Sequence, residues 1–153
     1  MEDLARLLPH RPPMVLIEGV EAFDPDAKRV VVSLKTDDSN LFFSAGGVPS
    51  WVAIEYMAQA SAVLVGLRDR SRAPDCAPRA GMLLGTRRME VGLSRFAAGE
   101  AYHASAECVF EDSDAASFQC EIRDAAECVV ASATLNAYRP LDMAAFLKEH
   151  AAT

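Results

Sequence analysis

The spacing of hydrophobic and polar residues predicts strands in both halves of the chain and one long helix between them. Apolar residues dominate positions 14–23 and 28–36, and the turn sequence Asp24-Pro25-Asp26 separates the two stretches, which predicts a pair of antiparallel strands. From 51 to 68 the apolar residues occupy nearly every face of a helical pattern, as in a helix that is buried on most sides. Four more strand-like stretches follow, at 81–91, 100–110, 117–123 and 128–138.

The order of these elements predicts the architecture. Residues 1–8 should form one or two helical turns that end before Pro9, and 69–80 has the composition of a loop. We therefore expect a single α+β domain over 1–153, in which an antiparallel six-stranded sheet wraps around one central helix at about 50–68, followed by a C-terminal helical tail at about 141–150. This is the hotdog fold. Because it leaves one helix face and one sheet edge without cover, we expect a dimer.

Composition and charge narrow the classes of partner. The 153 residues are 51% hydrophobic and 24% charged, with a formal net charge of −7, which is ordinary for one globular domain. The acidity argues against nucleic acid and against an anionic membrane surface as general partners. No apolar run approaches the ~20 residues of a membrane span, and the acidic start lacks the pattern of a signal peptide, so we expect a cytoplasmic protein.

The sequence offers no metal or cofactor motif. Its 4 cysteines form no Cys-x-x-Cys pair and have no histidine at metal spacing, so no metal site is expected. All but Cys76 lie in strand-like stretches, where a free cysteine is a small buried hydrophobe; a disulfide between two of them is the alternative. Walker, nucleotide-binding and Gly-x-Ser-x-Gly motifs are absent, so no cofactor is expected.

Three ordered motifs resemble a known enzyme family. The stretch 7–18 (LLPHRPPMVLIE) resembles the opening of the FabZ-type 3-hydroxyacyl-[acyl-carrier-protein] dehydratases, 55–60 (EYMAQA) resembles the start of their central helix, and 81–85 (GMLLG) resembles their next strand. The string 48–55 (VPSWVAIE) is most similar to the ApeP-like dehydratases of aryl-polyene biosynthesis. The resemblance implies the hotdog fold, and a thioester substrate carried by acyl carrier protein.

One departure from that family bears on the chemistry. The standard dehydratases carry a histidine in a Gly-His-Phe-Pro-Gly loop shortly before the helix glutamate. Here the corresponding segment 43–48 (FSAGGV) is shorter and contains no histidine. The family's usual base therefore cannot be transferred to this chain.

Dehydration of a 3-hydroxyacyl thioester needs an acid for the leaving hydroxyl and a base for the C2 proton. Glu55 is the candidate acid because it interrupts an apolar helix, where burial would keep a carboxyl protonated; a place on the helix's polar stripe is the alternative. Gln59 lies on the same face and would orient Glu55, bind substrate or make a structural hydrogen bond. His10 is the candidate base, with a loop histidine bonded to the backbone as the alternative; His103 and His150 are weaker candidates.

The loop before the helix supplies further candidates for substrate binding. Gly46 and Gly47, together with the helix N-terminus, could offer backbone N–H groups to the thioester oxygen, although paired glycines more often make a turn. Trp51 could line an acyl or aryl tunnel; a place in the core is the alternative.

Arginines are concentrated in the acidic chain's middle. Residues 68–95 hold seven arginines against three acidic residues. A carrier protein is acidic and brings a phosphopantetheine phosphate, which arginine binds well, so we expect a docking patch that includes Arg87, Arg88 and Arg79. A solvated loop face is the alternative.

Three functions follow from these residues. The first is dehydration of carrier-protein thioesters by Glu55, with His10 or a water molecule as the base. The second is a hotdog thioesterase, in which Glu55 activates water and the missing histidine is not needed. The third is a non-catalytic subunit that binds acyl chains or completes a partner's active site. The assembly would be a homodimer or a heterodimer with another hotdog subunit.

Overall fold

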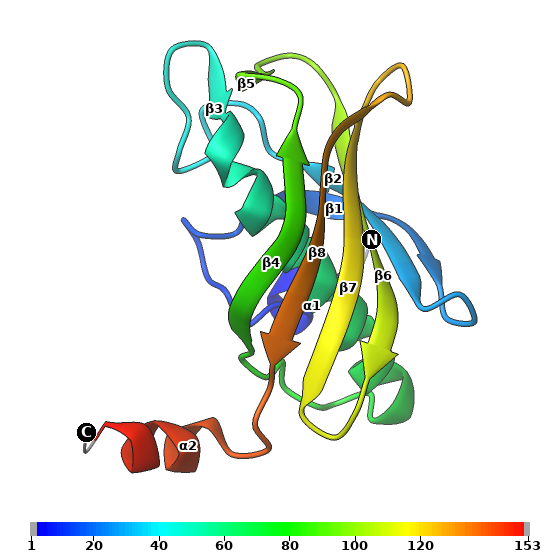
Figure 1. Cartoon of the computed structure of the whole chain (residues 1–153), viewed down its shortest axis with the longest axis vertical. Helices are drawn as coiled ribbons and strands as arrows, with labels where there is room; N and C mark the ends of the chain where they lie inside the picture. Colours follow the sequence, from blue (N-terminus) through cyan, green and yellow to red (C-terminus); the bar gives the residue numbers. More distant parts are fainter. Residues whose placement is uncertain (1–2, 152–153) are drawn as a thin grey trace.

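The computed structural model describes residues 3–151, and its centre is a six-stranded antiparallel sheet curved around one long helix (Figure 1). The strand order is β1-β2-β6-β7-β8-β4, so β1 and β4 form the two edges. The helix is α1 (Ala53–Arg72), and the strands are β1 (Ile17–Asp24), β2 (Arg29–Leu34), β4 (Met82–Val91), β6 (Tyr102–Glu111), β7 (Ala115–Asp124) and β8 (Val129–Tyr138). The expected hotdog architecture is confirmed.

Short elements connect and extend this body. A 3-10 turn, η1 (Leu4–Arg6), begins the described chain, and another, η2 (Ser50–Val52), leads directly into α1. Strands β3 (Gly47–Pro49) and β5 (Arg95–Ala97) pair with each other as a separate small sheet, which the sequence pattern did not predict. The tail forms α2 (Met143–His150), which runs outward from the foot of the sheet (Figure 1).

The core lies between α1 and the concave face of the sheet, where β2 and β6 lie closest to the helix and β7 and β8 continue the buried layer. In β6 the residues at every second position are buried against the helix: Tyr102, Ala104, Ala106 and Cys108. The two alanines are small, which lets the helix backbone approach the sheet closely. By length and hydropathy, Ser50–Arg72 could also cross a membrane, but most of it is buried inside this sheet, as in the core helix of a globular domain.

The helix extends beyond its expected end. It continues to Arg72, whereas 69–80 was expected to be a loop, because the polar residues of its last turns bind to neighbouring elements: Arg68 to Glu111 and Asp69 to Arg139. All four cysteines are free thiols, so no disulfide links them. Among the described residues, no group of three His, Cys, Asp or Glu side chains could hold a metal ion.

Candidate active site

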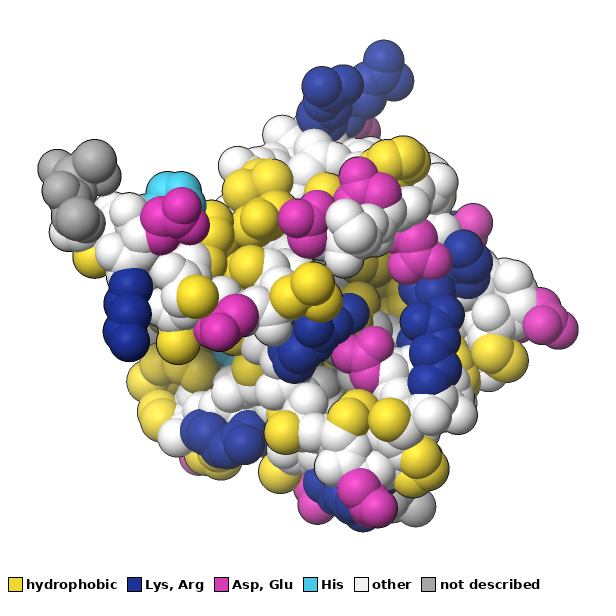
Figure 2. Space-filling model, turned by 90° about the horizontal axis from the view of Figure 1, so that it is seen from below, with side chains coloured by type: hydrophobic (Ala, Val, Ile, Leu, Met, Phe, Trp, Pro, Cys, Tyr) yellow, Lys and Arg dark blue, Asp and Glu magenta, His cyan; other side chains and the backbone are white. Residues whose placement is uncertain are grey.

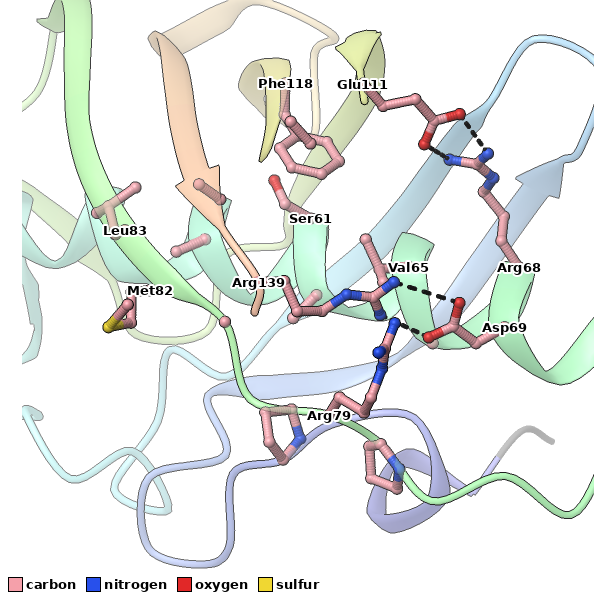
Figure 3. A pocket seen from close by; sticks show the side chains of 18 of the residues that line it. Ser61, Val65, Arg68, Asp69, Arg79, Met82, Leu83, Glu111, Phe118 and Arg139 are labelled. Atoms are coloured by element: carbon pink, nitrogen blue, oxygen red, sulfur yellow. Dashed lines mark hydrogen bonds and ion pairs between the residues drawn. The ribbon is translucent and has the colours of Figure 1, made fainter. Parts of the chain in front are cut away.

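A groove runs along the side of α1 that faces β8 and β4. It encloses about 300 Å³. On the helix it is bordered by the small or half-buried residues Ala58, Ser61, Ala62 and Val65, and Phe118 and Leu135 face them from the sheet. Figure 3 shows Ser61, Val65 and Phe118 pointing into this space. Because the side chains on the helix are small, they do not fill the gap between helix and sheet, and the groove stays open.

Glu55 and His10 meet at the end of the groove near the start of α1. His10 Nε2 lies 3.5 Å from Glu55 Oε1, and both residues line the groove. Their side chains are 29% and 31% exposed, so ligand in the groove can reach both. His10 Nδ1 is buried and has no hydrogen-bond partner among residues 3–151. The structure therefore brings together the two residues that the sequence predicts as base and acid, although they are 45 positions apart.

Gln59, one turn further along α1, holds the side chain of Glu55 in place. Its side chain is fully buried, and its Nε2 donates hydrogen bonds to Glu55 Oε1 at 2.8 Å and to the Met14 carbonyl at 2.6 Å. Its Oε1 accepts a bond from the Leu16 N–H at 2.9 Å. Both amide protons are therefore used, and no donor is left for a substrate. Of the roles predicted for Gln59, orientation of Glu55 fits these contacts, and the same bonds tie the helix to the segment 14–16.

The N-terminal segment presents His10 to the helix. Leu7 and Leu8 are buried, and Arg11 Nη1 donates to the carbonyls of Leu8 and His10 at 3.0 and 2.8 Å, which folds the segment back on itself. Leu7 lies directly against Gly66 of α1, where a Cβ would come within 2.4 Å of the Leu7 carbonyl oxygen. Only a residue without a side chain allows this contact.

Charged residues close the other end of the groove, near the last turns of α1. Arg139 Nη1, after β8, lies 2.5 Å from Asp69 Oδ2, and Arg68 binds Glu111 at 2.6 Å (Figure 3). Hydrogen bonds from Arg68, together with Lys28, hold the pKa of Glu111 at about 2, well below its ordinary value. Viewed from below, basic and acidic side chains alternate around a hollow that contains hydrophobic groups (Figure 2). The sequence pattern points to arginines in this region but does not predict the pair of Asp69 with Arg139, because the two residues are 70 positions apart.

The predicted substrate-binding residues Gly46, Gly47 and Trp51 do not line the groove. Gly47 packs so closely on β5 that a Cβ would lie 2.3 Å from the Phe96 carbonyl oxygen, and its N–H donates to the Ser44 carbonyl. Gly46 precedes it in the same turn, and its carbonyl accepts a bond from Ala98 N–H. The contacts of the pair are those of a turn. Trp51 is 60% exposed and meets Phe42 edge-on at 5.3 Å between ring centroids.

The three arginines of the predicted docking patch are divided. Arg79 lines the far end of the groove, beside Asp69 and Arg139 (Figure 3). Arg87 and Arg88 are exposed on β4 and do not border the groove. Arg88 lies in a bulge of that strand with a positive φ of 51°.

Comparisons with known proteins identify the family of this chain. Residues 2–148 match the model of a family described as ApeP-like, ApeP dehydratase. The chain is 29% identical to a chain of the dehydratase heterocomplex ApeI:P from Xenorhabdus doucetiae, with a TM-score of 0.85 and coverage of 97% of both chains. It is 31% identical over 80 residues to the 3-hydroxyacyl-[acyl-carrier-protein] dehydratase FabZ of Chlamydia pneumoniae, covering 47% of this chain and 52% of that one.

The chain thus spans about half the length of the curated relatives it matches. A hypothetical thioesterase from Streptococcus pneumoniae, solved with coenzyme A, shares the fold at 16% identity with a TM-score of 0.58, covering 79% of this chain and 84% of that one.

Proposed function

Because the chain belongs to the ApeP-like dehydratase family, we propose that it catalyses the dehydration of 3-hydroxyacyl thioesters carried by an acyl carrier protein. One observation carries the proposal: His10 and Glu55 face the same groove with 3.5 Å between Nε2 and Oε1. The two bonds that break in this reaction are on adjacent carbons, about 1.5 Å apart. A base and an acid must therefore lie close together, as this pair does.

The contacts suggest a role for each group. His10 Nε2 takes the proton from C2, the C2=C3 double bond forms, and the C3 hydroxyl leaves as water with a proton from Glu55. Because Gln59 donates to Oε1 of Glu55, the transferable proton belongs on Oε2. After water leaves, the proton on His10 must return to Glu55 Oε2 to complete the cycle, and the neighbouring Oε1 lies 3.5 Å from Nε2.

The edge of β4 suggests where a partner subunit would bind. This strand pairs only with β8, and its Leu83 and Leu84 are 43% and 64% exposed. An unpaired strand with exposed leucines favours association. We propose that a second hotdog subunit, of this chain or of another, adds there, and the similarity to a chain of the ApeI:P heterocomplex supports a different chain.

Arg87 and Arg88 remain our proposal for the carrier-protein contact. Both are exposed on β4, away from the groove, where an acidic protein could reach them. Replacing both with Glu should weaken turnover of carrier-bound substrate and leave small thioesters unaffected. Equal loss with both substrates would contradict this role.

The test is turnover by the purified protein, alone and with a hotdog subunit encoded beside it. With 3-hydroxyacyl thioesters, formation of a 2-enoyl thioester indicates dehydration, and release of free thiol indicates the thioesterase alternative. Activity only in the mixture indicates that the partner completes the site. Glu55→Gln should lower dehydration by a factor of 10² to 10⁴, roughly the range of acid–base catalysis.

Matched variants separate chemistry from general damage. Glu107→Gln changes an exposed glutamate on the outer face of β6 and should keep full activity. His10→Asn should lower turnover by about 10²-fold, whereas His103→Asn should not. Full activity of Glu55→Gln would refute the proposed role of Glu55.

A further inference from the structure

The C-terminal helix α2 packs lightly on the rest of the described chain. It is 8 residues long, and none of these residues is buried. Phe146 meets Tyr138 of β8 at 5.4 Å between ring centroids and stacks on His150 within the helix itself. A helix this short is marginal in water unless one of its faces packs against another surface, because its first turn is costly to form. A further surface is therefore needed to hold α2.

One side of α2 is apolar and partly open to solvent. Met143, Phe146 and Leu147 recur at the spacing of one helix face, and Leu147 is 53% exposed. Leu141, in the connection before the helix, is 80% exposed. Lys148 and Glu149 lie away from this apolar side. Exposed leucines gathered on one short segment favour an interaction site.

The connection between the sheet and α2 is held firmly. Tyr138, the last residue of β8, pairs with Met82, the first residue of β4. The next residue, Arg139, binds Asp69 of α1 at 2.5 Å. Beyond this point the chain leaves the sheet, and α2 runs outward on the side of the β4 edge (Figure 1). The tail is therefore directed toward the space beside β4.

The tail extends an apolar surface that begins on β4. Leu83 and Leu84 directly follow Met82 and are 43% and 64% exposed. A stable interface takes about 20–30 residues from each partner, whereas β4 has only 10. The segment 141–150 adds as many again, which brings the surface to about the size that β4 alone does not reach.

We propose that α2 is an arm that packs, through Leu141 and Leu147, on a hotdog subunit of a different chain bound at the β4 edge. The inference rests on the subunit addition proposed above and names the segment that secures it. The match to the ApeP-like family extends to residue 148 and so includes most of α2. The similarity to a chain of the ApeI:P heterocomplex, over 97% of both chains, supports a different chain as the partner.

The charges on β4 also disfavour a second copy of this chain. Two copies paired along the full length of β4 would be related by a two-fold axis, with the middles of their antiparallel strands opposite each other. Arg87 and Arg88 are exposed near this middle, so the arginines of both copies would meet at the axis. Like charges opposite each other in paired strands are destabilising. Side chains stand out from the faces of a sheet, so pairing with a different chain leaves both arginines accessible to a carrier protein.

Hydrogen exchange of α2 tests the arm directly. The full chain is measured alone and with the hotdog subunit encoded beside it. The backbone amides of 143–150 should exchange about tenfold more slowly in the complex, because a packed helix opens less often. Unchanged exchange, or no complex between the two subunits, would overturn the proposal. Exchange that slows as the concentration of this chain alone is raised would assign the arm to a second copy and contradict the proposed partner.

Variants locate the contact. The double change Leu141→Ala with Leu147→Ala keeps good helix formers and should raise the dissociation constant of the complex by about 30-fold, measured by sedimentation. The control, Lys148→Ala with Glu149→Ala, removes two exposed side chains away from the apolar side without changing the net charge, and should change affinity by less than about threefold. Equal affinities for the two variants would refute the arm. Turnover is measured separately, so loss of the dehydratase assignment alone would leave the binding result standing.

Discussion

Helix α1 contacts the rest of the molecule closely on one side and loosely on the other. On the close side, Gly66 touches the Leu7 backbone at the border of the groove, and Gln59 bonds to both Met14 and Leu16. On the loose side, Ala58 and Ala62 border the groove. The close side fixes the position of Glu55 relative to His10, and the loose side leaves room for a ligand.

The difference shows how one helix can both hold Glu55 in position and leave space for a ligand. A pair that acts as proposed must be held to within about 0.5 Å, and the fully buried Gln59 fixes Glu55 by using all of its donors. A substrate chain needs only volume and an apolar wall, which small residues provide by leaving space. Substitutions on the close side should therefore affect folding, and those on the loose side should affect ligand binding.

The largest effect on stability is expected from Gln59→Met. The change keeps the size of the side chain but leaves the buried Leu16 N–H and the half-buried Met14 carbonyl without their partner. At about 1–3 kcal/mol for each unsatisfied group, the free energy of unfolding should fall by roughly 3 kcal/mol. Urea denaturation measures it. The control is Gln119→Met on the exposed face of β7, which should change stability by less than about 0.5 kcal/mol. Similar losses for both variants would show that the hydrogen bonds of Gln59 do not stabilise the fold.

Gly66→Ala should lower stability less. Its Cβ would lie 2.4 Å from the Leu7 carbonyl oxygen, a backbone atom, so the helix or the N-terminal segment must move. We expect a loss of about 1–3 kcal/mol, as for other overpacked sites. Gly85→Ala on β4 is the control because no atom lies within 4 Å of its added Cβ. Equal melting temperatures for Gly66→Ala and Gly85→Ala would show that the helix and Leu7 are not in tight contact.

On the loose side, Ala62→Leu should leave folding intact and block the ligand. Its side chain would extend into the groove, so the affinity for an S-alkyl pantetheine probe should fall by about tenfold, which corresponds to ~1.4 kcal/mol. The melting temperature should stay within about 3 °C of the unchanged protein. Ala125→Leu, in the exposed turn before β8, controls for added hydrophobicity. Unchanged probe affinity would mean that the ligand does not lie along this side of the helix.

The sequence predicts more of the close side than of the loose side. The apolar pattern of 51–68 and the alternation in the strands identify the buried helix and its sheet, because burial leaves a periodic signal. His10 and Glu55 are found through short motifs. The pair of Asp69 with Arg139 leaves no periodic signal, since neither residue is buried in a repeating pattern. The small sheet of β3 and β5 is also missed, because three-residue strands are too short to show alternation.

The smallest effect on stability should come from Glu111, at the charged end of the groove. Because Arg68 and Lys28 hold its pKa at about 2 in the folded protein, against an ordinary value of 4.5, the unfolded chain binds more protons between these values. The stability from these pairs is thus fully present above about pH 4.5 and is lost as the pH falls toward 2.

Glu111 is 36% exposed, so solvent screens its ion pairs and the loss should stay below about 1 kcal/mol. When the free energy of unfolding is measured by urea denaturation between pH 6 and pH 2.5, it should fall less steeply with decreasing pH for Glu111→Gln than for Glu107→Gln. A loss of several kcal/mol that depends on Glu111 would show that this end of the groove is held as firmly as the end with Glu55 and His10. The contrast between the two sides of α1 would then not extend to its charged groups.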